Sequence, residues 1–312
     1  MSNEITKQQS DAFWHIKAFA IFTVFFAHMP GHEMNGTDYM IDAFDAIGMF
    51  GVPLFMMLSG YFNYSSKFSW VKTLKSLFIP LLIWGTICYI LHIIKTPTDS
   101  PIIDWIKFVG GSKSIFYFVP MLFCCIVLFR YLNGWLLLVI GLTTQMLTTY
   151  THFIPYNDIW TQNLNPFIFV VPFAVGRLIR RFNCLSEYKE WWLVLSFIVL
   201  ALFFVLKGKP DYYSPFTVVF TSSLLIFLYG IFMRFSRKWI NYIGKISFVI
   251  YLCHIQIAGA IQAVSKPLWG SYIEPLKVIV AFAIVVLFCI GIQLVVEIVI
   301  KKPELLKLIG YR

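Results

Sequence analysis

Ten long apolar runs, separated by short polar segments, dominate the chain. They fall at residues 13–30, 44–62, 76–95, 114–132, 135–150, 165–180, 191–207, 215–233, 246–265 and 275–300. Most of them contain the roughly 17–25 residues that an α-helix needs to cross a bilayer. The segments between them, none longer than about twenty residues, leave no room for a soluble domain. The pattern predicts an all-α, polytopic membrane protein of about ten transmembrane helices. We expect a single domain over residues 1–312, with no appended soluble domain.

The composition indicates that lipid is the solvent for most of this surface. Hydrophobic residues make up 59% of the chain and charged residues only 13%. Soluble domains carry about 25% charged residues. With half that charge, the apolar surface exceeds what one soluble core could bury, so the runs are expected to lie in a membrane.

The distribution of Lys and Arg predicts an orientation. If the N-terminus is cytoplasmic, 18 of the 25 basic residues fall in inner segments and 7 in outer ones. Basic residues concentrate on the cytoplasmic side of membrane proteins. Both termini are therefore expected in the cytoplasm, with an even number of helices. The net charge of +10 follows from this flanking pattern, and we expect no nucleic-acid partner.

The first run holds two ionisable residues, Lys17 and His28, eleven positions apart. At about 100° per residue they project from one face of a helix, separated by about 16 Å along its axis. Ionisable groups inside a membrane are costly and usually face a cavity or a partner. Both are functional candidates. The alternative is a lysine that reaches the membrane surface and a histidine with a structural hydrogen bond.

Other polar groups occur at the ends or in the middle of later runs. Lys72 and Lys75 precede the third run, where they are suited to phosphates or anionic headgroups or simply mark the cytoplasmic side. His254 follows Lys245 by nine residues, which predicts a mid-membrane position for either a functional or a core histidine. Ser59 lies in a segment whose small residues also favour close helix packing.

Six segments, in order, resemble motifs of the acyltransferase type 3 family of membrane acyltransferases. Lys17 and His28 match its first-helix motif of a basic residue and a histidine, and the other segments are GVPLFMMLSGYF (51–62), WVKTLKSLFIP (70–80), SIFYFVPMLFCCIVLF (114–129), FIFVVPFAVGRLIRR (167–181) and INYIGKISFVIYLCH (240–254). The resemblance covers nearly the whole chain. Lys17, Lys72 and Lys75 stand where the family usually has Arg, which binds phosphate with a bidentate fork that Lys lacks.

The resemblance implies an enzyme that transfers an acyl group, usually acetyl from acetyl-CoA, to a hydroxyl of a cell-surface or lipid-linked glycan. It implies a location in a bacterial plasma membrane, acetyl-CoA as the donor, and no metal. The residues that we expect to bind the donor are Lys17, Lys72, Lys75 and Arg177.

The expected chemistry centres on His28, which either acts as a general base or carries the acyl group. His254 and Glu33 are expected to assist it, and Asp42, Asp45 and Ser59 to bind the acceptor. The acidic residues are open to a second interpretation as a solvated outer loop.

Two other classes of function fit the same pattern. Broken helices and charged cavities also serve transport, so a polysaccharide exporter or a flippase for lipid-linked glycans is the main alternative. A structural membrane subunit is the other. Stabilisation by CoA distinguishes the enzyme from both. The sequence does not predict an oligomeric state.

Overall fold

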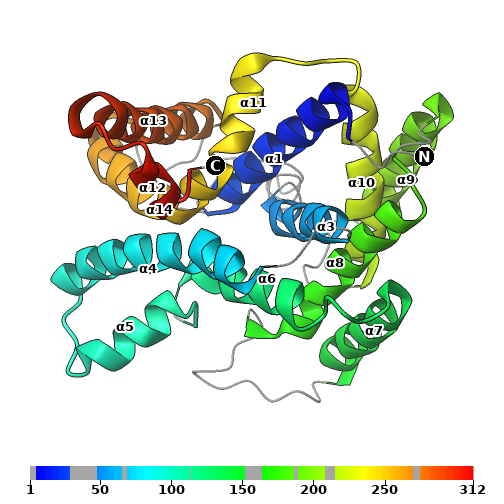
Figure 1. Cartoon of the computed structure of the whole chain (residues 1–312), viewed down its shortest axis with the longest axis horizontal. Helices are drawn as coiled ribbons and strands as arrows, with labels where there is room; N and C mark the ends of the chain where they lie inside the picture. Colours follow the sequence, from blue (N-terminus) through cyan, green and yellow to red (C-terminus); the bar gives the residue numbers. More distant parts are fainter. Residues whose placement is uncertain are drawn as a thin grey trace.

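The computed structural model describes residues 5–28, 48–64, 69–112, 114–151, 164–185, 189–207, 215–269 and 275–311. These residues form helices and connecting turns, with no strand among them (Figure 1). In chain order the α-helices are α1 (Lys7–Ala27), α3 (Gly51–Asn63), α4 (Trp70–Lys95), α5 (Pro101–Val109), α6 (Phe118–Val127), α7 (Gly134–Thr151), α8 (Pro166–Arg181), α9 (Glu190–Lys207), α10 (Pro215–Phe232), α11 (Lys238–Lys245), α12 (Ser247–Trp269), α13 (Pro275–Leu294) and α14 (Glu304–Leu308). A 3₁₀ turn, η1 (Ile115–Tyr117), precedes α6, and a π-helical segment, η3 (Val295–Ile300), follows α13.

Each of the ten predicted runs contains a helix, so the all-α prediction is confirmed for the described residues. By length and apolar composition, two helices in this part of the chain are suited to crossing a membrane, Trp70–Lys95 and Lys277–Ile300. A third span results if α11 and α12, which meet at an angle of 75°, are counted together. The number of about ten spanning helices and the cytoplasmic position of both ends stay predictions.

Two helices are much shorter than the runs that predicted them. α3 has 13 residues and α6 has 10. At 1.5 Å per residue they extend about 20 and 15 Å, against the roughly 30 Å of a hydrocarbon core. Pro53 and Pro120 occupy the first turn of α3 and α6, where a missing backbone N–H leaves no hydrogen bond unmade. The hydropathy of the sequence does not indicate where such a helix begins within a longer apolar run.

α1 lies in the middle of the molecule and contacts α3, α10, α11 and α12 (Figure 1). A reciprocal pair of hydrogen bonds between Thr6 and Gln9 closes its first turn. Its apolar side chains are buried on several sides, and Ile16, Ile21 and Phe25 have no exposed surface. A helix that is apolar all round belongs inside a bundle. Polar groups on α1 therefore meet other helices.

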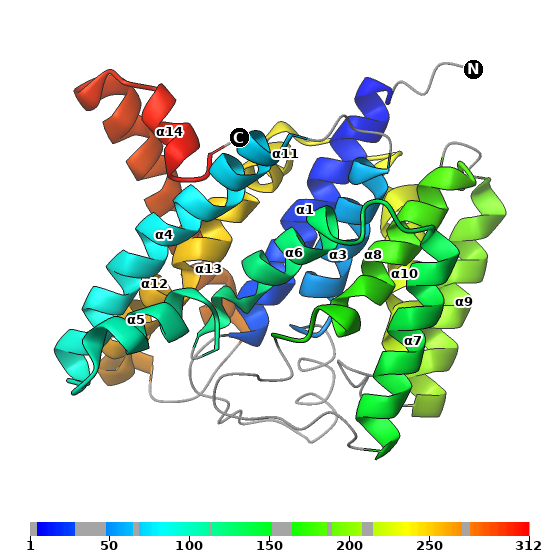
Figure 2. The same cartoon turned by 60° about the horizontal axis from the view of Figure 1, so that its bottom comes forward.

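Two hydrophobic clusters pack on either side of α1. One joins the first half of α1 to α3, α8 and α10. The other joins the second half of α1 to α4, α6, α12, α13 and α14. Figure 2 shows this division, with α7 to α10 on one side and α4, α12 and α13 on the other. Phe55 of α3 packs against both clusters, so α3 marks the boundary between them.

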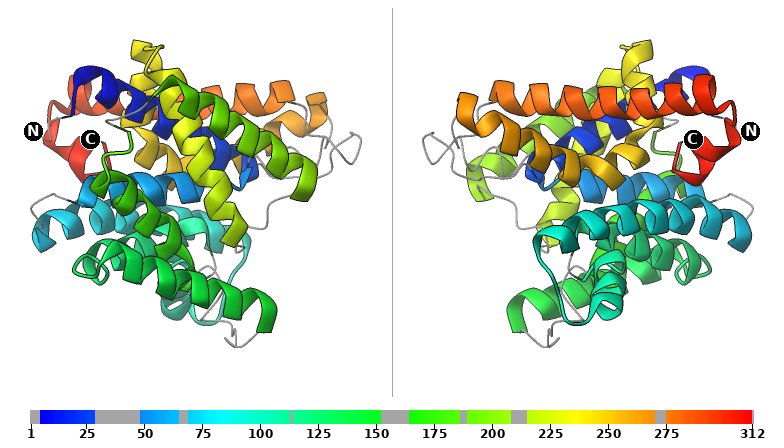
Figure 3. Two further views of the ribbon diagram at one scale, coloured as in Figure 1. Left: turned by 90° about the vertical axis from the view of Figure 1, so that its right-hand side faces the viewer. Right: turned by 90° about the vertical axis from the view of Figure 1, so that its left-hand side faces the viewer.

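The beginning of α1 and the short helix α14 lie at the same end of the bundle (Figures 2 and 3). The first two turns of α4, which carry Lys72 and Lys75, lie toward this end as well (Figure 2). The predicted cytoplasmic lysines of three separate segments are thus gathered at one end of the molecule.

Candidate functional site

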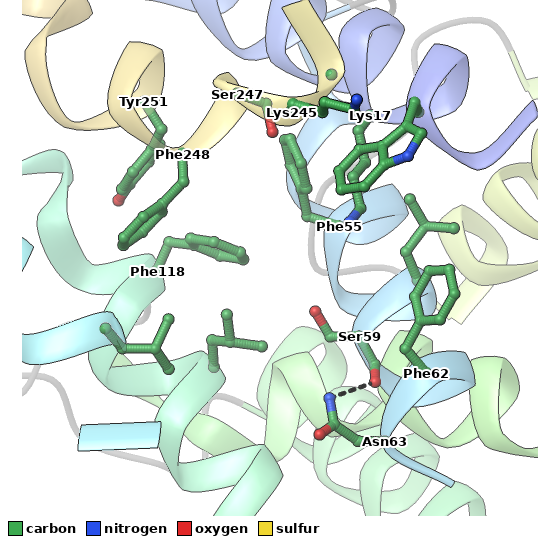
Figure 4. A pocket seen from close by; sticks show the side chains of 15 residues that line it. Lys17, Phe55, Ser59, Phe62, Asn63, Phe118, Lys245, Ser247, Phe248 and Tyr251 are labelled. Carbon is green, nitrogen blue, oxygen red and sulfur yellow. Dashed lines mark hydrogen bonds between the residues drawn. The ribbon is translucent and has the colours of Figure 1, made fainter. Parts of the chain in front are cut away.

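A narrow cavity of about 270 Å³ lies at the boundary between the two hydrophobic clusters (Figure 4). Its lining comes from α1, α3, α4, α6 and the junction of α11 with α12. The polar lining residues include Lys17, Ser59, Lys245, Ser247 and Tyr251, and the rest are mostly apolar. The structure therefore brings two of the predicted site residues, Lys17 and Ser59, into one cavity.

Lys17 is held among aromatic rings. Its Nζ lies 4.3 Å from the ring centroid of Trp14 and 5.3 Å from that of Phe62. An ammonium group over an aromatic face is attracted by the ring quadrupole. These contacts keep the cation beside the cavity, whose lining includes Lys17.

Lys245 enters the cavity because α11 ends and α12 begins at this point. A Cβ on Gly244 would lie 2.0 Å from the carbonyl oxygen of Trp14, so only glycine lets α11 approach α1 this closely. The 75° bend then places Lys245 and Ser247 on either side of the junction, at the cavity. A half-broken helix can expose polar groups inside a membrane protein where it lines a cavity.

A wide cavity of about 880 Å³ adjoins the narrow one. The two share the lining residues Ser59, Phe62, Asn63, Leu77 and Leu122. Lys72, Lys75 and Lys307 line the wide cavity, together with the hydroxyl residues Ser69, Thr73 and Ser76. Among the described lining residues of both cavities there is no Asp or Glu. Several lysines around a concave site raise the local concentration of anions, so the adjoining cavities are suited to an anionic ligand.

The two predicted histidines also meet. His28 caps the C-terminal end of α1, and the ring centroids of His28 and His254 are 5.6 Å apart. His254 has no exposed surface, and its Nδ1 lies 2.7 Å from the carbonyl oxygen of Tyr251. Since a carbonyl oxygen only accepts, Nδ1 carries the hydrogen and Nε2 of the neutral ring is an acceptor. Among the described residues, Nε2 has no hydrogen-bond partner.

Tyr251 lies between the lysines and the histidines. It lines the narrow cavity, its ring centroid is 5.9 Å from that of His254, and its hydroxyl donates to the carbonyl oxygen of Ile115. Phe118 packs against it, with ring centroids 5.3 Å apart. Neither histidine lines either of the two cavities. Lys17 and His28 belong to α1 as predicted, but only Lys17 lines the narrow cavity, whereas His28 packs against His254, whose ring contacts Tyr251 of that lining.

Arg177, predicted to bind the donor, is located elsewhere. It lines a separate hollow of about 300 Å³ with Tyr64, Asn133 and Arg181. One of its guanidinium nitrogens donates to the carbonyl oxygens of Phe129 and Arg130, at 3.0 and 2.7 Å. These carbonyls follow the end of α6 and lack helical partners. The observed role of Arg177 is to tie α8 to the end of α6.

The remaining predicted residues cannot be placed, and others were missed. Glu33, Asp42 and Asp45 lie outside the described residues. Lys245, Tyr251 and Lys307 line the cavities without having been singled out. Lys245 and Tyr251 belong to the segment INYIGKISFVIYLCH, whose resemblance to a family motif was the available signal. Lys307 had no signal beyond its charge.

The chemistry available to this arrangement follows from its parts. Lysines can hold phosphate or carboxylate groups, the aromatic and aliphatic lining can enclose an apolar chain, and a neutral imidazole offers one hydrogen-bond donor and one acceptor. In the part of the chain that the structure describes, no three His, Cys, Asp or Glu side chains are grouped in a way that could hold a metal ion.

Comparison with known proteins supports the resemblance seen in the motifs. A family model described as an acyltransferase domain matches residues 12–294, which include Lys17, Ser59 and both histidines. No curated protein and no solved structure gives a significant match. The match extends over nearly the whole chain, and the apolar helices are those of a membrane protein. The chain therefore belongs to the type 3 acyltransferase family.

Proposed function

We propose that the protein transfers an acetyl group from acetyl-CoA to a hydroxyl of a cell-surface or lipid-linked glycan. The observation that carries this proposal is the pair of adjoining cavities, which are lined by several lysines and by Tyr251. The ring of His254 packs against Tyr251, and His28 packs against His254. Membership of an acyltransferase family supports the reaction class. We propose a multi-pass protein of a bacterial plasma membrane, with the lysine end in the cytoplasm, where acetyl-CoA is made.

The shape of the donor supports its assignment to these cavities. CoA has a bulky, phosphate-rich nucleotide at one end and a thin, largely uncharged arm that ends in the thiol. The wide cavity offers Lys72 and Lys75, and the narrow cavity offers a mostly apolar lining with Ser59. Their volumes, about 880 and 270 Å³, are of the size that small-molecule sites have. In this pose the thioester points toward Tyr251 and the histidine pair.

The histidines supply the proton transfer that the reaction needs. The glycan oxygen forms a bond to the thioester carbonyl carbon, and the bond from that carbon to sulfur breaks. His28 takes the hydroxyl proton as general base and returns a proton to the CoA thiolate as it leaves. His254, whose acceptor nitrogen has no partner among the described residues, orients or relays that proton. In this proposal the thioester reaches the histidines past the ring of Tyr251, which lines the narrow cavity and packs against His254.

The acceptor is expected to approach from the opposite end of α1. His28 is the C-cap residue of α1, and residues 29–47, which follow it, lie outside the described residues. Glu33, Asp42 and Asp45 fall in that segment and stay predictions as catalytic and glycan-binding residues. Carboxylates and imidazoles near the outer membrane surface are suited to hydrogen bonds with sugar hydroxyls.

Replacing His28 by Ala tests the proposal. We expect glycan O-acetylation by membrane vesicles supplied with acetyl-CoA to fall at least about 100-fold, the usual contribution of a general base. His92→Ala is the matched control, since His92 is an exposed histidine of α4 that lines neither cavity. Unchanged acetylation by His28→Ala, at normal protein levels, would exclude His28 from catalysis.

A flippase for lipid-linked glycans is the second candidate, and the bend at the junction of α11 and α12 favours it. Transporters place broken helices of this kind at their substrate sites. A ligand that binds the folded state raises the unfolding temperature of the purified protein. CoA is expected to do so for an acyltransferase. A protein that CoA leaves unchanged, but that still moves a lipid-linked glycan across vesicles, would be the flippase.

A further inference from the structure

The C-terminal tail, residues 301–311, lies beyond the part of the chain that matches the family model. It leaves η3 at Lys301, whose backbone is left-handed with φ 57°, and forms the short helix α14. A second left-handed residue, Gly310 with φ 102°, follows α14. These two turns fold the tail back against the bundle, so that it lies beside α4 (Figures 1 and 2).

Hydrogen bonds and burial anchor this tail to the bundle. The indole nitrogen of Trp84 in α4 donates to the carbonyl oxygen of Ile309 at 3.0 Å. The Tyr311 hydroxyl donates to the carbonyl oxygen of Cys289 in α13. Leu306 and Tyr311 are both buried, with 7% of their surface exposed. Burial also raises the pKa of the Tyr311 phenol, which keeps it neutral and able to donate. The tail is therefore packed firmly against the bundle.

The packed tail places Lys307 in the lining of the wide cavity. The tail contributes Lys307, Leu308, Gly310 and Tyr311 to the lining, while Lys72 and Lys75 come from the first turns of α4. Lys307 is exposed on α14 even though its neighbour Leu306 is buried. Three ammonium groups from two segments more than 200 residues apart thus border one cavity, with Ser69, Thr73 and Ser76 as further hydrogen-bond donors. Multiple lysines and hydroxyls around a concave surface are suited to a ligand with several phosphate groups.

We infer that the C-terminal tail completes the binding site for the phosphate-bearing nucleotide end of CoA, and that Lys307 binds its phosphates together with Lys72 and Lys75. The inference rests on the proposed acyl-CoA donor and adds a structural element that the family match does not include. The wide cavity is the place for the nucleotide because the narrow cavity, at about 270 Å³, accommodates only the arm. The tail then helps to determine that the nucleotide end of the donor lies in the wide cavity.

The test compares donors with and without phosphates on the purified full chain. Lys307→Gln removes the charge but keeps the length of the side chain. We expect about tenfold weaker binding of CoA, because a charge-assisted hydrogen bond contributes about that factor to an affinity. Binding of pantetheine, which lacks the nucleotide and its phosphates, is expected to be unchanged. Lys302→Gln is the matched control, an exposed lysine of the same tail that lines neither cavity.

A second variant tests the placement of the tail. Trp84→Phe removes the hydrogen bond to Ile309 and keeps an aromatic ring. It is expected to weaken CoA binding and leave pantetheine binding unchanged, because the tail loses an anchor while the narrow cavity stays intact. If Lys307→Gln binds CoA as the wild type does, Lys307 is not part of the donor site, and unchanged CoA binding by Trp84→Phe would show that this anchor of the tail does not support the site.

Anionic lipid is the other source of phosphate, and a third arm separates it. Wild type and Lys307→Gln are reconstituted in nanodiscs of phosphatidylcholine with or without phosphatidylglycerol, and CoA binding is measured in each. A loss of CoA affinity in both compositions supports the nucleotide site. If Lys307→Gln keeps its CoA affinity and loses only the rise in unfolding temperature that phosphatidylglycerol gives the wild type, the inference is overturned in favour of a headgroup site. If the wild type binds no CoA at all, the proposed function fails with it, whereas unchanged CoA binding by Lys307→Gln overturns only the role of the tail.

Discussion

The two faces of α3 are packed in opposite ways. Toward α8, a Cβ added to Gly60 would lie 2.0 Å from the carbonyl oxygen of Phe173, and one added to Gly176 would lie 1.9 Å from that of Met57. The two backbones touch. On the other face, Ser59 and Asn63 border the narrow and the wide cavity. One helix thus has a face without free space and a face that leaves room for a ligand.

This difference shows how a short helix can form a stable cavity wall. α3 is too short to span a bilayer by itself, and small residues let helices approach closely in membranes, where van der Waals contact drives their association. The contact with α8 therefore holds α3 in place, so that side chains need not pack tightly against its other face. Neighbouring residues of one motif, Ser59 and Gly60, serve these two opposite requirements.

The largest expected effect comes from breaking the packed face. Gly176→Ala puts a Cβ against the backbone carbonyl of Met57, which cannot move without moving α3. We expect a loss of about 3 kcal/mol or more in stability, in the upper range for overpacked sites. Thermal unfolding of the purified protein in detergent measures it.

Gly291→Ala is the control for that experiment. A Cβ at Gly291, in α13, meets nothing within 4 Å. The same substitution there is expected to be neutral or stabilising by about 0.5–1 kcal/mol, as for Gly→Ala in other helices. Equal unfolding temperatures for the two variants would mean that the α3–α8 contact is not tight.

The next effect comes from filling the open face. Ser59→Phe adds a ring where both cavities have space, so the fold is expected to remain within about 1 kcal/mol of the wild type, as for surface substitutions without strain. Acyl transfer and CoA binding are expected to be lost, because the ring occupies the passage between the cavities. A folded variant that keeps normal CoA affinity would show that the donor does not pass Ser59. Gly60→Ala, one residue on, is expected instead to destabilise the fold about as much as Gly176→Ala, because its Cβ would meet the carbonyl oxygen of Phe173.

The smallest expected effect comes from removing one charge from the lining of the narrow cavity, which the open face of α3 borders. Lys17→Ala is expected to raise the KM for acetyl-CoA about tenfold while leaving kcat within about twofold, as for the loss of one charge-assisted contact made equally in the ground and transition states. Lys17→Arg is expected to be close to the wild type, since it keeps the cation beside Trp14 and Phe62. Lys95→Ala, at the exposed end of α4, is the control. A fall in kcat without a change in KM would place Lys17 near the reacting atoms.

Much of the helical fold could be predicted from hydropathy, because a helix in lipid must be apolar along its length. All ten predicted runs contain helices. The shortness of α3 and α6 was missed, since the apolar runs continue past these helices. The helix α11 and its bend against α12 were missed because the apolar run there begins only at residue 246. The helices α5 and α14 lie in segments that the run pattern left out.

For the candidate site, the sequence identified groups that are costly to bury but could not say which of them meet. Lys17, Ser59, Lys72 and Lys75 line joined cavities, and His28 packs beside His254, whereas Arg177 ties α8 to the end of α6. In the sequence, a basic residue that lines a cavity and one that ties two helices together look alike, because both stand at the end of an apolar run. Which role the residue takes depends on the carbonyls and charges that other helices bring next to it.

The sequence by itself determined that this chain is helical, apolar enough for a membrane, and similar along most of its length to an acyltransferase family. These properties follow from residue types and spacings along one segment at a time. Only the tertiary structure decided that Lys245 and Lys307 join the earlier lysines around two connected cavities, and that Tyr251 lies between those cavities and the histidines. Such proximities arise from the packing of distant segments, here from glycines that let backbones touch and from a tail held to Trp84.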